Sequence, residues 1–485
     1  MKTISLALMM MAACAPKSNE PVGVVDFRAS APAPLERNEF RLPTAQQVQL
    51  SNGLRVVYVQ DEAVPMSRVT VAFRLGSFAE DESNTGLVGS TFDMLNEGID
   101  GHDSLSISAS MKRLGSSLST AGGLDGGYVS VSGLTRNLDE SLEFLKGALT
   151  TPTFRADDWE RLQKNYQQDL QKARSTPGDI ARRVFRKAFY GGTYAGRLSS
   201  EDSIAALNVE DMVTWWETHA VVENAMVVAT GDLPLEQLVP KLESALGEML
   251  SGAAMDVPEP TINELDQTEI LFVHKSGSAQ SVIRMGRDLG SDYGDEDYWP
   301  IRVGNGAFGG IFMARLNMNL REDKGYTYGA RSGTYRNYGA DRWELSTSVR
   351  TDATAASLFE IFKELADIGG DAPARPLSEE EIRYAQGSSI NGYPARFETP
   401  NTLLQQLSDI WRYDLPSDAV EAYIANVDSV EPAAAQRAFA EKIAEKPMLV
   451  VVVGDWEVVG ESVTALGYTV RQIDVDGNPL EAAEE

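Results

Sequence analysis

Past residue 40, the hydrophobic positions of the chain follow two different spacings. Residues 47–60 and 68–75 carry apolar side chains at every second position, which predicts β-strands. Residues 86–98 and 138–149 instead carry them at helical spacing, which predicts amphipathic helices. An apolar strand at residues 224–233 follows and ends in Gly-Asp. Strands and helices therefore alternate through the first half of the chain.

The second half repeats these signals in the same order. Residues 268–286 predict strands, residues 358–368 predict an amphipathic helix, and residues 448–455 predict an apolar strand that again ends in Gly-Asp. The two endings lie at Asp232 and Asp455. This order of elements indicates an internal duplication.

The repeat and the length together predict an α+β fold of two homologous domains, each a largely antiparallel sheet covered by helices. A chain of 485 residues is too long for one core, since single cores stop growing beyond ~250–300 residues. We place the N-terminal domain at residues 40–248 and the C-terminal domain at residues 261–470. Residues 249–260 have the composition of a linker, and residues 471–485 form an acidic tail.

The N-terminus resembles the signal of a bacterial lipoprotein. Residues 1–13 contain one cation and an apolar run too short to span a bilayer, and they precede Cys14, the sole cysteine of the chain. We expect lipidation at Cys14 and a Pro- and Ala-rich tether at residues 14–39. The protein is then anchored in the cell envelope, on the outer membrane facing the periplasm. The alternative is an ordinary signal peptide with an incidental cysteine.

Charge and residue usage exclude several functions. The formal net charge of -28 disfavours binding to nucleic acids or to anionic membrane surfaces. The three histidines, His102, His219 and His274, are too far apart in sequence for a one-turn zinc motif, and one cysteine cannot build a thiolate site. We interpret each histidine as a surface or capping residue. The sequence also lacks a G-x-S-x-G elbow and a phosphate-binding glycine loop.

The most informative stretch is residues 304–335, GNGAFGGIFMARLNMNLREDKGYTYGARSGTY. Its pattern predicts a helix over residues 312–320, a turn at Gly325, and a strand with Tyr326 and Tyr328 on one face. The stretch resembles the pitrilysin/insulinase-type metallopeptidases, which include the mitochondrial processing peptidases and share the signature G-G-x-x-x-x-R-L…L-R-E-x-x-G-x-x-Y. The matching residues are Gly309, Gly310, Arg315, Leu316, Leu320, Arg321, Glu322, Gly325 and Tyr328.

The resemblance covers nearly the whole body of the chain, and it implies where a zinc site would lie. The family carries an inverted motif, H-x-x-E-H, on the first helix and a distant Glu ligand. Here the motif positions hold Gly89, Phe92 and Asp93, and the distant position falls near Gln167. A catalytic zinc needs three protein ligands and a base. We therefore expect no metal and no other cofactor in this chain.

The resemblance also implies a role for the intact signature. In two-chain members of the family, one subunit holds zinc and its partner supplies an Arg and a Tyr, which match Arg321 and Tyr328. Gly309, Gly310 and Tyr326 are assigned to substrate binding on the same basis. A guanidinium and a phenol suit this task because both donate hydrogen bonds to a carbonyl oxygen as it gains charge. The alternative is a surface ion pair at Arg321 and a sheet-packed Tyr328.

These observations lead to a hypothesis with two rivals. The chain is expected to be the zinc-free subunit of a heterodimeric metallopeptidase that degrades peptides, with zinc in a paralogous partner. The first rival is a structural or peptide-binding scaffold of the same fold without catalytic function. The second is a hydrolase that acts alone, which predicts cleavage by the isolated chain without metal. Membrane contact is expected through the lipid alone.

Overall fold

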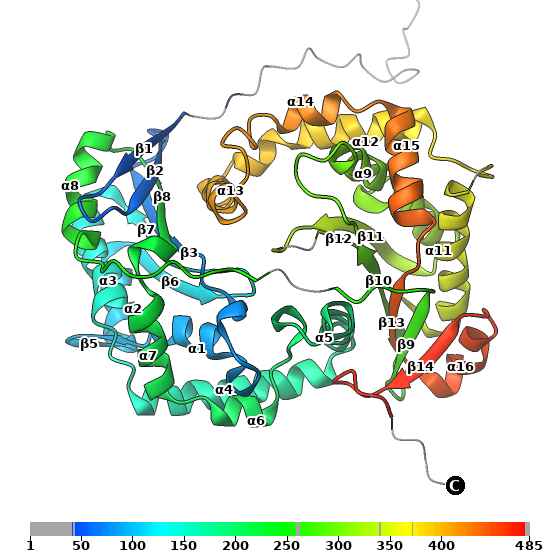
Figure 1. Ribbon diagram of the computed structural model, residues 1–485, viewed down its shortest axis with the longest axis horizontal. Helices are drawn as coiled ribbons and strands as arrows, with labels where there is room; N and C mark the ends of the chain where they lie inside the picture. The colour runs from blue at the N-terminus through cyan, green and yellow to red at the C-terminus, as the bar shows by residue number, and fades with distance from the viewer. Residues whose placement is uncertain (1–40, 42–43, 259–261, 339–340, 371, 481–485) are drawn as a thin grey trace, which may run out of the picture. The chain divides into compact units, whose positions relative to one another are not determined.

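The computed structural model describes residues 41, 44–258, 262–338, 341–370 and 372–480 (Figure 1). Cys14, the predicted signal and almost all of the predicted tether lie outside these residues. From Thr44 onward the described residues belong to one compact unit. Within them, no helix is both long and apolar enough to cross a bilayer.

Two six-stranded sheets are present in the described part of the chain, and each is built from one half of the sequence. The first sheet has the order β1-β2-β8-β3-β7-β6 and the second the order β11-β12-β10-β13-β9-β14. The strands of the first are β1 (Ala45–Gln49), β2 (Arg55–Gln60), β3 (Met66–Phe73), β6 (Ser116–Gly122), β7 (Gly127–Leu134) and β8 (Ala225–Gly231). Those of the second are β9 (Glu269–His274), β10 (Gln280–Asp288), β11 (Thr327–Tyr335), β12 (Arg342–Arg350), β13 (Leu449–Gly454) and β14 (Thr469–Ile473).

Helices surround both sheets. The first half contributes α1 (Leu87–Met94), α2 (Ser104–Leu114), α3 (Leu138–Thr150), α4 (Ala156–Ser175), α5 (Pro177–Tyr190), α6 (Glu201–Ala206), α7 (Val209–His219) and α8 (Leu235–Leu246), with a small hairpin of β4 (Gly98–Ile99) and β5 (His102–Asp103). The second half contributes α9 (Tyr298–Asn305), α10 (Arg315–Asn317), α11 (Thr354–Ile368), α12 (Glu379–Gly392), α13 (Pro400–Arg412), α14 (Tyr423–Asp428), α15 (Pro432–Phe439) and α16 (Trp456–Thr464).

The predicted duplication is confirmed by the strand order. Read from the matching edge, β2-β8-β3-β7-β6 corresponds to β9-β13-β10-β12-β11. The directions correspond as well, because β2 and β8 are parallel, β9 and β13 are parallel, and the other three pairs in each set are antiparallel. The fold is therefore two homologous α+β domains, each with a largely antiparallel sheet covered by helices.

The Gly-Asp ending of the first apolar strand has a packing cause. A side chain at Gly231, the last residue of β8, would collide with the hydroxyl of Ser67 on β3. That hydroxyl shares a hydrogen bond with Thr135, with the two oxygens 2.8 Å apart, and Thr135 in turn donates to Asp232. The strand end, the neighbouring strand and the turn before α3 are thus fixed by one polar cluster.

The second domain repeats the glycine, serine and threonine contacts of this cluster but gives the aspartate another partner. A side chain at Gly454, the last residue of β13, would collide with the hydroxyl of Ser281 on β10. Ser281 accepts a hydrogen bond of 2.7 Å from Thr354, the first residue of α11. Asp455 then caps α16 by accepting from the backbone N–H of Glu457 at 3.2 Å. Both strand endings therefore follow from the same local contact.

The two domains exchange one helix each. The helix α5 of the first domain lies on β13 and β10 of the second sheet, where its apolar side chains join those of β9 and β13 in one buried cluster. The helix α13 of the second domain lies against β8 of the first sheet, with Leu404 and Trp411 beside Met226 and Val228. The strands β8 and β13 are thereby covered on both faces, which explains why all their residues are buried and nearly all are apolar.

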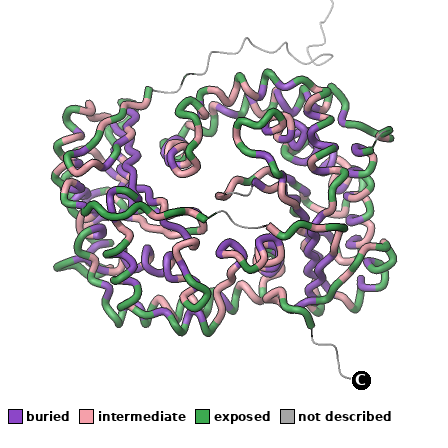
Figure 2. The backbone as a smooth tube through the Cα atoms, in the orientation of Figure 1, coloured by how far each residue is buried: buried purple, intermediate pink, exposed green. Residues whose placement is uncertain are grey.

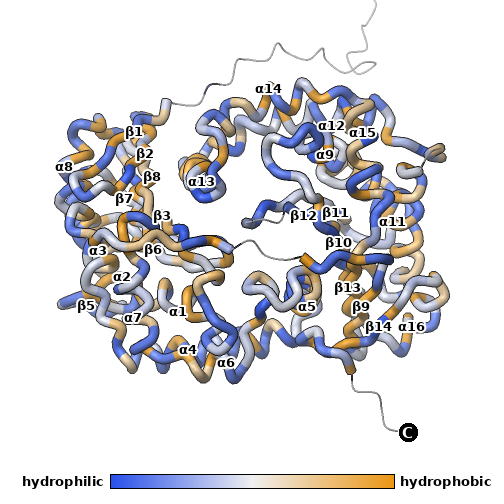
Figure 3. The backbone as a smooth tube through the Cα atoms, in the orientation of Figure 1, coloured by the Kyte–Doolittle hydropathy of each residue, from blue (hydrophilic) through white to orange (hydrophobic). Residues whose placement is uncertain are grey.

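The figures show this burial directly. Buried residues run along β9 and β13 beside α5 (Figure 2), and the same strands form a continuous hydrophobic segment (Figure 3). Polar contacts add to both helices: Arg183 on α5 pairs with Asp476 at 3.2 Å, and just after α13 Asp414 pairs with Arg74 at 2.5 Å. Next to it, Tyr413 donates to the carboxylate of Asp125 at 2.9 Å.

The C-terminal boundary predicted from sequence is wrong at its start. Residues 471–473, assigned to an acidic tail, belong to β14, which pairs in parallel with β9. The strand comprises Thr469–Ile473, and the acidic composition of the C-terminal segment did not indicate it. The remaining domain boundaries stay predictions.

Replacing Phe185 should reveal how much the exchanged helix α5 contributes. Phe185 is buried against the second sheet, so Phe185→Ala is expected to lower the free energy of unfolding by about 3–5 kcal/mol. Phe359→Ala, at an exposed position on α11, should change it by less than about 0.5 kcal/mol. Urea-induced unfolding measures both variants. Equal, small losses would contradict a joining role for α5.

Candidate functional site

The helix α1, which matches the zinc-motif helix, begins in a well-defined way. Gly86 precedes it with a positive φ of 103°, a conformation that glycine adopts without strain. The buried carboxylate of Glu80 accepts from the backbone N–H groups of Gly86 at 3.0 Å and Val88 at 2.8 Å. Burial raises the pKa of Glu80, while these two hydrogen bonds oppose the rise. The helix start therefore has a fixed position even though its motif has changed.

Neither of the first two motif positions offers a metal ligand, and one of them, Phe92, has joined the hydrophobic core. Gly89 has no side chain, and a Cβ there would meet no atom closer than 3.9 Å. Phe92 is fully buried, with its ring centroid 5.8 Å from that of Phe73 and 5.5 Å from that of Trp216. A side chain at Gly127 would collide with the Phe92 ring, so the strand beneath has adapted to it.

The third position, Asp93, has a hydrogen-bonding partner in place of a metal. Tyr166 on α4 donates its hydroxyl to the Asp93 carboxylate. Burial raises the pKa of Asp93, and the bond from Tyr166 opposes that rise. Burial and the nearby Asp93 charge raise the pKa of Tyr166. Gln167, the position expected to face the motif, is exposed, so Tyr166 is the residue of α4 that faces Asp93.

Zinc does not fit the residues present at this position. Of the three motif positions Asp93 alone offers a metal ligand, whereas a catalytic zinc takes three. In the part of the chain that the structure describes, no group of three His, Cys, Asp or Glu side chains could hold a metal ion. The three histidines lie on separate elements, β5, α7 and β9. No step of a reaction can therefore be assigned to a metal held by these side chains.

Arg321 lies in a π-helical turn, Met318–Asp323, that follows α10. Its guanidinium carbon is 4.7 Å from the centroid of the Phe312 ring, and Nη1 is 3.4 Å from the carboxylate of Glu322. Nη1 is buried and has no hydrogen-bond partner among the described residues. The side chain is 34% exposed. The ion pair predicted as the alternative is thus present, but it leaves a donor unsatisfied.

Tyr328 and Tyr326 do not lie on one face, and that prediction is wrong. The pairing of β11 with β12 shifts between Thr327 and Ala330, so β11 carries one extra residue there. Such a bulge turns a side chain out of the ladder. Tyr328 is accordingly 91% exposed, while Tyr326 packs partly against the second core. The alternative that Tyr328 packs in the sheet is wrong as well.

The remaining signature residues have structural contacts. Gly309 is buried, and a Cβ there would collide with Ser332 on β11, so close packing explains this glycine. Gly310 is exposed, and a binding role for either glycine stays a prediction. Arg315 is buried and forms a bidentate pair with Glu381, at 2.8 and 2.6 Å. The predicted helix begins at Arg315 rather than at residue 312.

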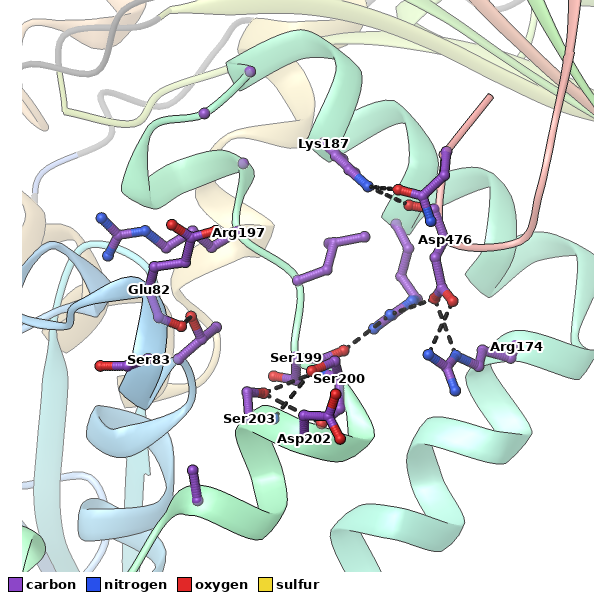
Figure 4. Close-up of a pocket in the computed structure, with 18 residues that line it drawn as sticks. Glu82, Ser83, Arg174, Lys187, Arg197, Ser199, Ser200, Asp202, Ser203 and Asp476 are labelled. Carbon is purple, nitrogen blue, oxygen red and sulfur yellow. Dashed lines mark hydrogen bonds and ion pairs between the residues drawn. The ribbon is translucent and has the colours of Figure 1, made fainter. Parts of the chain in front are cut away.

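A cavity of about 680 Å³ lies elsewhere, between α4, α5 and α6 (Figure 4). Its cations already have partners. Asp476 accepts from Arg174 at 3.0 Å and Arg183 at 3.2 Å, and its backbone carbonyl accepts from Lys187 at 2.9 Å. The segment after β14 thus occupies the basic side of this cavity and joins it to the first domain.

The Asp93–Tyr166 hydrogen bond should be measurable as a pH-dependent contribution to stability. Tyr166→Phe removes a donor to a buried carboxylate, so the free energy of unfolding should fall by about 1.5–3 kcal/mol at neutral pH. The variant raises the pKa of Asp93 in the folded state further. As pH falls, Asp93 is therefore protonated at a higher pH in the variant than in the unchanged protein. The loss should therefore shrink toward acid pH.

The exposed Tyr384 offers a matched control for this variant. Tyr384→Phe should leave the free energy of unfolding unchanged at every pH. Thermal or urea unfolding from pH 4 to 8 compares the two. A loss in Tyr166→Phe that is independent of pH would contradict the assignment of a charged Asp93 as its acceptor.

Comparison with known proteins agrees with this geometry. Residues 55–201 match the family model for insulinase (peptidase family M16), and residues 206–388 match the model for the peptidase M16 inactive domain. The chain is similar to the non-peptidase homolog YmxG of Helicobacter pylori, with 21% identity over 395 residues, 80% of this chain and 86% of that protein. It is also similar to the uncharacterized zinc protease SCO5738 of Streptomyces coelicolor, with 22% identity over 86% of this chain and 91% of that protein.

A solved structure shows the same fold. The peptidase M16 inactive domain from Pseudomonas fluorescens aligns with a TM-score of 0.76 at 21% identity, covering 85% of this chain and 98% of that chain. The matched models, the duplicated sheets and the intact C-terminal signature agree with one another. The chain is a member of peptidase family M16, the insulinase-like family, and contains both an insulinase-type domain and the domain that the family describes as inactive.

Proposed function

We propose that this chain is the zinc-free subunit of a two-chain zinc metallopeptidase that degrades peptides in the cell envelope. The observation that carries the proposal is the contrast between two sites in one chain. The motif positions offer Gly89 and the buried Phe92 in place of ligands, whereas Tyr328 is 91% exposed and the Arg321 side chain is 34% exposed. Packing within the fold explains the residues at the motif positions, but it gives no role to the exposed side chains of Arg321 and Tyr328.

The chemistry of the second site suits a substrate carbonyl. A peptide carbonyl oxygen gains negative charge when its carbon is attacked, and donors aimed at that oxygen stabilise the charge. The guanidinium of Arg321 supplies fixed N–H donors, and the phenol of Tyr328 supplies an O–H donor. Zinc in the partner subunit would supply the activated water, since the motif positions of this chain cannot hold it.

A structural scaffold is the second candidate. The relative from Helicobacter pylori is named a non-peptidase homolog, and another structural neighbour is a chain of complex III2 from Candida albicans, at a TM-score of 0.70. A scaffold needs a stable surface but no exposed donors for a carbonyl oxygen. The two candidates therefore share the fold and differ in whether Arg321 and Tyr328 bind the carbonyl oxygen of a substrate.

Reconstitution with a zinc-bearing paralogue separates these candidates. Arg321→Ala and Tyr328→Phe should each lower kcat/KM for peptide cleavage by ~10²–10³ while the two chains still associate. The control is Arg182→Ala, at an exposed arginine paired with Asp179 on α5, which should leave cleavage unchanged. Unchanged cleavage in the signature variants, with the complex intact, would favour the scaffold. Cleavage by the isolated chain without metal would favour a self-sufficient hydrolase.

The envelope location rests on Cys14, which lies outside the described residues. Cys14→Ser should move the protein from the membrane fraction to the soluble fraction, because the acyl anchor, the one membrane contact expected, is lost. Ser18→Ala, a nearby change that spares the cysteine, should stay with the membrane. Immunoblots of fractionated cells read both. Persistent membrane association of Cys14→Ser would contradict lipidation at this residue.

A further inference from the structure

Two exposed apolar side chains lie immediately before α10. Phe312 is 59% exposed and Met313 is 49% exposed, and both precede the first helical residue, Arg315. Single exposed apolar residues are common and need no explanation. Here two of them are adjacent in sequence and lie in a turn between the signature residues Gly310 and Arg315.

This turn is held by a buried amide. Asn317 is 4% exposed, and its Nδ2 donates to the backbone carbonyl of Phe312 at 2.8 Å. Its Oδ1 accepts from the backbone N–H of Ala330 at 3.2 Å, two residues beyond Tyr328. One side chain thus fixes the Phe312 turn to the strand that carries the exposed tyrosine. Binding to such a fixed surface costs less conformational entropy than binding to a mobile one.

The same turn reaches Arg321. The guanidinium lies over one face of the Phe312 ring, 4.7 Å from its centroid. A cation over an aromatic face is attracted by the ring, and this contact orients the guanidinium. Nη1 still lacks a hydrogen-bond acceptor among the described residues. The Arg321 side chain is nevertheless 34% exposed, so the surface combines a fixed apolar part with an accessible guanidinium.

We infer that Phe312 and Met313 form an apolar subsite for a large hydrophobic side chain of the peptide whose backbone carbonyl binds Arg321. This inference rests on the proposed function for the identity of the ligand as a peptide. Side chains and backbone carbonyls alternate along an extended peptide. One peptide can therefore place a side chain on Phe312 and Met313 and a carbonyl oxygen at Arg321. A folded protein is a poorer match, since stable interfaces bury about 800 Å² per partner and this subsite consists of two side chains.

Phe312 has a second task as a positioning residue for Arg321. Because its ring carries the guanidinium, replacing the ring with an aliphatic group keeps the subsite apolar but removes the support for the cation. The two tasks therefore separate by substitution. Selectivity for the peptide side chain depends on apolar area, whereas affinity for any peptide backbone depends on the orientation of Arg321.

Peptide binding to the isolated full-length chain tests the subsite without requiring the partner. Two fluorescein-labelled unstructured peptides of about twelve residues, identical except for a central Phe or Ser, are compared by fluorescence anisotropy. The Phe peptide should bind about tenfold more tightly, as expected for burial of one large apolar side chain. In Phe312→Ser/Met313→Ser this ratio should fall to about one. Leu105→Ser, at an exposed apolar residue on α2, should preserve it.

A second pair of variants tests the positioning role. Phe312→Leu should weaken both peptides equally, by about two- to fivefold, and keep their ratio, while Phe312→Tyr should restore the affinity. Equal affinity for the Phe and Ser peptides in the unchanged chain, or no binding of either at millimolar concentration, overturns the subsite. Failure of the proposed catalytic role would appear separately, as cleavage that is insensitive to Arg321→Ala in the reconstituted pair.

Discussion

The exchange of α5 and α13 between the two sheets is the constraint on which the rest of the structure depends. Each helix covers the second face of a central strand in the other domain, so every residue of β8 and β13 is buried. Both domains are therefore held together, and the altered motif helix and the exposed signature belong to the same compact unit. Both contacts combine buried apolar side chains with polar partners, since Arg183 on α5 pairs with Asp476 and, just after α13, Asp414 pairs with Arg74.

The fold was largely predictable because its signals are local. Alternation identified β1 to β3, helical spacing identified α1 and α3, and the Gly-Asp endings marked β8 and β13. The site was predictable in residue identity but not in geometry. A one-residue bulge in β11 gives Tyr326 and Tyr328 different surroundings. On the long helix α4, Tyr166 rather than the neighbouring Gln167 faces Asp93. Such one-residue differences arise from tertiary contacts, which a pattern of polarity does not contain.

Two of the three motif positions, Phe92 and Asp93, have partners within the fold. Phe92 extends the core between β7 and α7, and Tyr166 satisfies the carboxylate of Asp93. The hydrogen bond between Tyr166 and Asp93 joins α4 to α1 without a metal ion. Sequence reasoning missed Asn317 and Phe312 because an amide and an aromatic residue in a predicted helix carry no signal. Their importance follows from the turn that they form with β11.

The matching clusters at the ends of β8 and β13 carry a consequence for how such a protein can diverge. In each copy, a serine hydroxyl fills the space that any larger residue at the terminal glycine would need. These positions tolerate almost no change, yet none of them belongs to the zinc-motif positions or to the C-terminal signature. The architecture and the chemistry can therefore drift independently, so that one copy can lose its reactive groups while the shared frame persists.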